Sequence, residues 1–152
     1  MNRLLCSWIA ASALFLSAQS LAEPTVFEYQ KVSGGVSAKK MKAIYDLIPN
    51  PTGDAKKARL AILQGMQQTK GVAWLVEGEG DGYVLARWDY KGHAIIHRIE
   101  YNNDAVQIKY AGGVNDYQCA IQKGDFCYKT HRNYYKYNRS LVKELKRALG
   151  NV

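Results

Sequence analysis

The spacing of apolar residues divides the chain into helical and extended segments. Over residues 37–48 the apolar positions recur at three- and four-residue steps, which is typical of a helix, and the prolines and glycine of 49–53 end it. A second helix is predicted from Asp54, a residue type that caps helix N-termini, to about Lys70. The same spacing predicts a final helix over about 131–149.

Between the second and the final helix, apolar and polar residues alternate, which is typical of strands. Four strands are predicted, over about 72–76, 83–90, 93–101 and 106–110. Short connections favour one antiparallel meander with the flanking helices packed on one face. We therefore expect a single α+β domain over 54–152. It follows an N-terminal extension over 23–53 that has a short helix and a short strand near 26–29.

The first 22 residues have the pattern of a cleaved secretory signal. Arg3 precedes an apolar run that is too short and too rich in serine and alanine to span a bilayer, and Ser20 and Ala22 provide small side chains before Glu23. We predict cleavage after Ala22, with a retained N-terminal anchor as the alternative. Cys6 stands at the start of the apolar run, whereas a lipobox cysteine follows it.

Removal of this segment leaves two cysteines, Cys119 and Cys127, on either side of a turn at Gly124 and Asp125. In an exported protein this spacing predicts a disulfide that closes a tight loop and contributes about 2–3 kcal/mol. The alternative, a redox-active pair, usually has a CxxC spacing, which is absent here.

Several short motifs of the domain occur together. They are Gly71 and Trp74 after the second helix, the strand at 93–101, Ile108-Lys109-Tyr110, His131-Arg132-Asn133-Tyr134, and then Tyr137 and Leu141. As a set, over about 58–149, they resemble a family of small exported bacterial proteins, many of them lipoproteins, whose function is uncharacterised. The resemblance implies the fold and an exported location but no activity. Because this chain lacks a lipobox and has the cysteine loop, lipid anchoring is not implied.

The length of 152 residues excludes a two-domain dehydrogenase or a TIM barrel, and no nucleophile elbow, phosphate loop or HExxH motif occurs. Three histidines could serve a metal site. His93 and His97 lie four residues apart on a predicted strand, about 13 Å, so they cannot share an ion unless His131 or another group approaches. The alternative interpretation is that His97 packs among apolar residues and His131 caps the final helix. We expect no cofactor.

Charge is distributed unevenly. Residues 23–116 contain 12 basic and 11 acidic residues, whereas 117–152 contain 8 basic and 2 acidic. On the final helix five cations follow each other at steps of 4, 3, 4 and 3, on the side away from Tyr134, Tyr137, Leu141 and Leu145. We name them the basic stripe: Arg132, Lys136, Arg139, Lys143 and Lys146. Lys123, Lys129 and the tyrosine of the disulfide loop, Tyr128, are expected beside it, and Tyr134, Tyr135 and Tyr137 interleave with the cations along the sequence.

Such a surface attracts anions, although every surface helix also has a solvated polar face. In a bacterial envelope the available polyanions are lipid headgroups, lipopolysaccharide, acidic cell-wall polymers and acidic protein patches. Nucleic acid would suit the same chemistry, but export argues against it. The sequence therefore predicts a non-enzymatic periplasmic module that binds an envelope component or a periplasmic protein. The alternative is a small metal-dependent or hydrolytic periplasmic enzyme that uses His93, His97 and His131.

Overall fold

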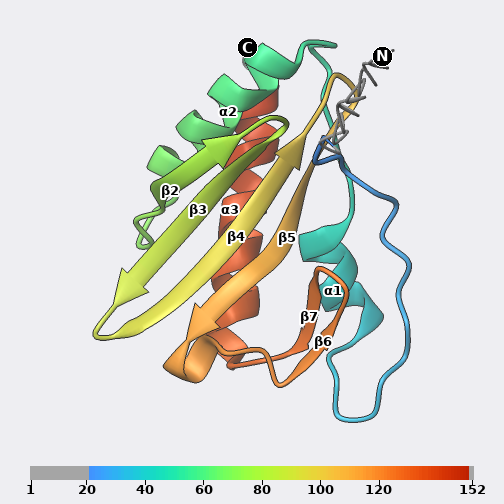
Figure 1. Ribbon diagram of the computed structural model, residues 1–152, viewed down its shortest axis with the longest axis vertical. Helices are drawn as coiled ribbons and strands as arrows, with labels where there is room; N and C mark the ends of the chain where they lie inside the picture. Colours follow the sequence, from blue (N-terminus) through green and yellow to red (C-terminus); the bar gives the residue numbers. More distant parts are fainter. Residues whose placement is uncertain (1–20, 151–152) are drawn as a thin grey trace, which may run out of the picture.

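The computed structural model describes residues 21–150, so most of the predicted secretory signal lies outside the described residues. Along the chain the elements are α1 (Ala38–Tyr45), β1 (Ile48–Pro49), α2 (Ala55–Gln68), β2 (Leu75–Gly80), β3 (Tyr83–Tyr90), β4 (His93–Tyr101), β5 (Ala105–Val114), the 3-10 helix η1 (Asn115–Tyr117), β6 (Ile121–Lys123), β7 (Phe126–Lys129) and α3 (Arg132–Leu149). Strands β2 to β5 form an antiparallel meander, with α2 and α3 behind it (Figure 1). The predicted α+β fold is confirmed.

The sheet has five strands, in the order β1-β5-β4-β3-β2, where four were predicted. The additional strand, β1, pairs Ile48 with Val106 and Pro49 with Ala105. Two residues are too few to show a period of two, and a proline normally indicates the end of an element. Pro49 is compatible with this strand because β1 is the edge of the sheet, where a missing N–H donor breaks no ladder.

Three other boundaries differ from the prediction. Residues 26–29 form no strand, and β2 begins at Leu75, so the buried Val72 and Trp74 lie in the loop before it. Strand β5 continues to Val114 through a register shift, whereas the predicted strand ended at about Tyr110. The cysteine loop is itself a hairpin, β6–β7.

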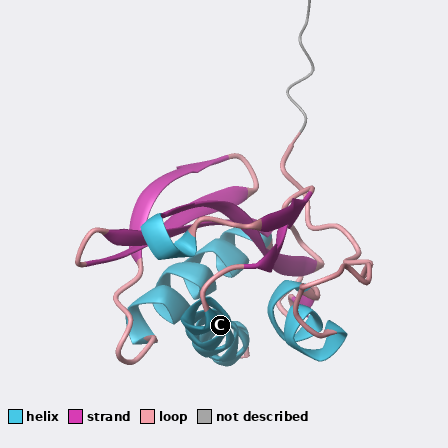
Figure 2. Ribbon diagram, turned by 90° about the horizontal axis from the view of Figure 1, so that it is seen from below, coloured by secondary structure: helices cyan, strands magenta, loops and turns pink. Residues whose placement is uncertain are grey.

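The helices lie on one side of the five-stranded sheet (Figure 2). Ile99 and Ile108 of the central strands, Ile62 of α2 and Leu145 of α3 are all fully buried between the layers. Helices α2 and α3 touch where Gly65 meets Leu145, and a Cβ atom on Gly65 would lie only 2.9 Å from Leu145 Cδ2. The absence of a side chain at Gly65 therefore allows these two helices to pack closely.

Helix α1 of the N-terminal extension belongs to the same core. Met41, Ile44 and Tyr45 are fully buried, and the Tyr45 hydroxyl hydrogen-bonds to that of Tyr134 on α3. The Cys127 backbone N–H of the β6–β7 hairpin donates to the same Tyr45 oxygen at 3.2 Å. One buried hydroxyl thus joins α1, the disulfide hairpin and α3.

Candidate functional site

The basic stripe lies on the solvent side of α3. All five of its side chains are exposed, and none forms an ion pair with a described residue. The opposite side of the helix is fully buried at Tyr134, Leu141 and Leu145, as predicted. The periodic sequence of α3 thus directs apolar residues to the sheet and an uninterrupted series of cations to solvent.

The one acidic residue of α3 does not neutralise this stripe. Arg147 Nη2 lies 2.7 Å from Glu144 Oε2, and the same nitrogen donates to Gln68 Oε1 of α2 at 2.8 Å. Arg147 is therefore the cation of α3 that is used within the fold. The five members of the stripe are exposed to solvent and have no carboxylate partner among the described residues.

The two lysines of the disulfide hairpin are both exposed but have different surroundings. Lys123 Nζ donates to Gln30 Oε1 at 3.0 Å, so this lysine contacts the N-terminal segment. Lys129 lies on β7, next to Gly34 of the loop before α1. A role for Lys123 and Lys129 in binding stays a prediction.

The tyrosines that interleave with the cations are mostly structural, which corrects the expectation that the tyrosine of the disulfide loop, Tyr128, lies beside the basic stripe. Tyr128, Tyr134 and Tyr135 are at most 5% exposed, and Tyr137 is half-buried. The Tyr135 hydroxyl donates to the Tyr128 carbonyl at 3.0 Å, and burial raises the pKa of Tyr135 to about 12. Tyrosine has an apolar ring and a polar end, so the sequence pattern that predicted the burial of Tyr134 did not also show that Tyr128 and Tyr135 are buried.

The three histidines occupy three different environments. His97 is fully buried between the sheet and α3, where Nε2 bonds to Asn138 Oδ1 and Nδ1 lies 3.3 Å from the Lys109 carbonyl oxygen. Burial lowers the pKa of His97 to about 4. His131 accepts a hydrogen bond from Asn133 N–H at the start of α3, which confirms that it caps this helix.

His93 lies at the first position of β4, 3.6 Å from Asp116 Oδ2. Within residues 21–150 no group of three or more histidine, cysteine, aspartate or glutamate side chains is close enough to hold a metal ion. The His97 ring packs against the Trp74 ring, with centroids 5.1 Å apart, so His97 is part of the core.

Cys119 and Cys127 form the predicted disulfide, with Cα atoms 5.7 Å apart. Disulfides persist in oxidising compartments, so this bond indicates an exported protein. Among the described residues, no helix has the length and apolar character needed to cross a membrane.

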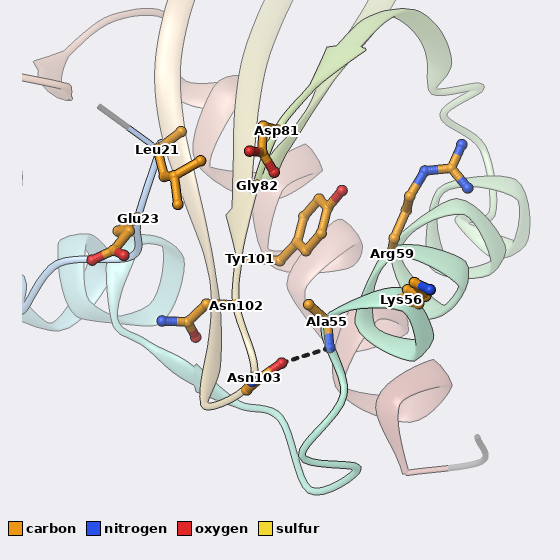
Figure 3. A pocket seen from close by; sticks show the side chains of 11 residues that line it. Leu21, Glu23, Ala55, Lys56, Arg59, Asp81, Gly82, Tyr101, Asn102 and Asn103 are labelled. Carbon is orange, nitrogen blue, oxygen red and sulfur yellow. Dashed lines mark hydrogen bonds between the residues drawn. The ribbon is translucent and has the colours of Figure 1, made fainter. Parts of the chain in front are cut away.

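A crevice of about 390 Å³ opens where the β2–β3 turn and the end of β4 approach the start of α2 (Figure 3). Tyr101 lines it, and Leu21 and Ala22 close one side, with the Ala22 carbonyl packed directly on Gly82. Arg59 at its margin is already bound to Glu79 through two hydrogen bonds of 2.7 Å. Because cleavage after Ala22 would remove one side of this crevice, we do not consider it the functional site.

The fold also places cations from α1 and α2, which are far from α3 in sequence, on helices that pack on the same side of the sheet as α3. Helices α1 and α2 contribute exposed, unpaired lysines next to the layer formed by α3: Lys39, Lys40, Lys42, Lys56 and Lys57. Together the three helices contain 12 basic residues and one acidic residue. The described residues outside them contain 8 basic and 12 acidic residues. A charge count for each predicted helix would have found this asymmetry.

Comparison of the chain with models of known protein families, with curated proteins and with solved structures finds no match. The resemblance to small exported bacterial proteins therefore stays a prediction from the motifs quoted above. What the protein does has to be argued from its surface.

Proposed function

We propose that this protein is a non-enzymatic binding module of the bacterial periplasm, which docks on an anionic component of the cell envelope through the basic stripe of α3. The observation that supports the proposal is that all five cations of the stripe are exposed and that no described carboxylate pairs with them. A cation without a carboxylate partner attracts an anionic ligand at full strength, whereas a cation in an ion pair is largely neutralised by its partner.

The dimensions of the stripe suit an extended anionic surface. At 1.5 Å of rise per residue, Arg132 and Lys146 are separated by about 21 Å along the helix. The two ends of the stripe are screened from each other by physiological salt, whose Debye length is about 8 Å, but each cation still attracts an anion that is in contact with it. Binding is therefore expected to fall steeply as salt rises.

The test compares two variants with the same change in net charge. The first changes Lys136, Arg139 and Lys143 to glutamate and so reverses the centre of the stripe. The second changes three exposed lysines in separate loops outside the helices, namely Lys31, Lys70 and Lys91, to glutamate. Retention of each purified protein on bacterial envelope fractions is measured from 20 to about 500 mM salt, spanning strong and weak screening.

The proposal expects salt-sensitive retention of the wild type and of the loop variant, and loss of retention in the stripe variant. Equal loss in both variants would show that net charge alone controls retention. Salt-insensitive retention of all three proteins would overturn the proposal and leave the stripe as a solvated helix face. Circular dichroism of the variants checks that each is folded.

A further inference from the structure

The charge of this protein is divided unevenly between its helices and the rest of the described chain. The helices on one side of the sheet have a formal charge of +11, and the described remainder has −4. Ten of the helical cations are exposed and unpaired. We name them the basic helical face: Lys39, Lys40, Lys42, Lys56, Lys57 and the five residues of the basic stripe.

From this uneven division we infer that the partner of the basic helical face is the surface of an anionic phospholipid bilayer. The protein lies on it with all three helices toward the headgroups and the sheet toward solvent. This inference rests on the proposed function and extends it in two respects: it names the partner, and it adds α1 and α2 to the binding surface.

The composition of the face favours lipid over a protein partner. Eight of its ten cations are lysines, which are depleted in protein–protein interfaces but are typical of polybasic segments that bind anionic lipids. Protein interfaces also need buried aromatic or aliphatic anchors. Among the large apolar residues that are exposed in the described chain, Leu60, at 52%, is the one that lies on α1, α2 or α3.

The arrangement of the helices also favours a broad surface. Figure 2 shows α2 and α3 side by side below the sheet, with α1 next to them. The direct contact of Gly65 with Leu145 keeps α2 and α3 in one layer, and the Tyr45–Tyr134 hydroxyl contact attaches α1 to it. Three helices on one side of the sheet thus contribute the ten exposed cations, and a flat array of headgroups is a partner that three neighbouring helices can contact together.

The test uses sedimentation with vesicles of phosphatidylglycerol and phosphatidylcholine in equal amounts, and with vesicles of phosphatidylcholine alone. The α1 variant changes Lys39, Lys40 and Lys42 to glutamine, and its matched control changes Lys31, Lys70 and Lys91 to glutamine. Each basic residue near an anionic bilayer contributes roughly fivefold in binding, so the α1 variant is expected to bind about a hundredfold more weakly. The matched control is expected to stay within about tenfold of the wild type, and the neutral vesicles to bind none of the proteins.

Two outcomes overturn the inference and leave the proposed function intact. If the α1 variant binds anionic vesicles as the wild type does while the α3 stripe variant does not, the surface is α3 alone. If envelope fractions retain the protein in the salt-sensitive way described above but anionic vesicles do not, the partner is another polyanion or an acidic protein. Equal binding to neutral vesicles would overturn the electrostatic basis of both proposals.

Discussion

Acidification from pH 6.5 to 4 should remove a large part of the folding stability through one residue, His97. Its side chain is fully buried, and this burial lowers its pKa from 6.5 to about 4, although the bonds to Asn138 and to the Lys109 carbonyl act in the other direction. In the unfolded chain His97 takes up a proton as the pH falls through 6.5, whereas the folded protein does so only near pH 4. Because the unfolded state binds more protons in this window, the free energy of unfolding falls as the pH falls.

The size of the effect follows from the two pKa values. One pKa unit corresponds to about 1.4 kcal/mol, so the fall from 6.5 to about 4 corresponds to a loss of about 3 kcal/mol. Small domains have total stabilities of about 5–15 kcal/mol, so the loss is readily measured. Urea unfolding at half-unit steps between pH 7.5 and 4 should show a slope that approaches 1.4 kcal/mol per unit below pH 6.

The matched variant is His97→Gln, which keeps a polar group opposite Asn138 but does not titrate. Its free energy of unfolding at pH 7.5 is expected to be lower than that of the wild type. Below pH 6.5 its stability should fall less steeply with pH, because the His97 contribution is absent while His93, His131 and the carboxylates are the same in both proteins. Parallel curves for the two proteins would refute this account. If the variant does not fold, the His97 ring resonances in the wild type provide the same test, since they should not titrate above pH 5.

Three further changes probe the packing that positions the helices. Replacing Cys119 and Cys127 together by alanine should lower the free energy of unfolding by about 2–3 kcal/mol in urea, because the loop-closing bond no longer restricts the unfolded chain. Tyr45→Phe should cost about 1–3 kcal/mol in the same assay, since the Cys127 N–H loses its acceptor inside the core. Gly65→Ala should lower the melting temperature although alanine favours helix by about 1 kcal/mol, because the new methyl group would overlap Leu145. An unchanged or raised melting temperature would show that α2 and α3 separate without cost.

The parts of the fold that were predictable from sequence are those with a long, uninterrupted period. Strand β4 and helix α3 have such patterns, and their observed bounds, His93–Tyr101 and Arg132–Leu149, agree with the prediction. Strand β1 was missed because two residues show no period and because its partner strand, β5, is distant in sequence.

The candidate surface was predictable in part for the same reason. Within one helix, spacing along the chain is also spacing in space, so the sequence alone was enough to put Arg132 and Lys146 on one stripe. Lys40 and Lys57 are far from α3 in sequence, and only the packing of three helices on one sheet face brings their helices, α1 and α2, to the same side of the sheet as α3. The burial of Tyr128, on the disulfide hairpin, was likewise decided by tertiary packing.

The stripe also has a cost in stability that a purely structural role would not explain. Lys136 has like charges one turn away on both sides, Arg132 and Arg139, and like-charge pairs at these spacings each destabilise a helix by about 0.2–0.5 kcal/mol. Lys136→Glu would convert both repulsions into attractions and should raise the free energy of unfolding by about 1 kcal/mol. Gln64→Glu on α2 is the control, because it also adds a negative charge to an exposed helix position but has no charged residue three or four positions away.

The same substitution is expected to weaken retention on envelope fractions. A variant that becomes more stable while it binds less would show that the stripe is kept for binding at the expense of stability, as is common at functional surfaces. A gain in stability equal to that of Gln64→Glu would show that general charge reduction, and not repulsion along the stripe, is responsible. No gain at all would contradict the argument, because five unpaired cations on one side of a helix would then cost the fold nothing.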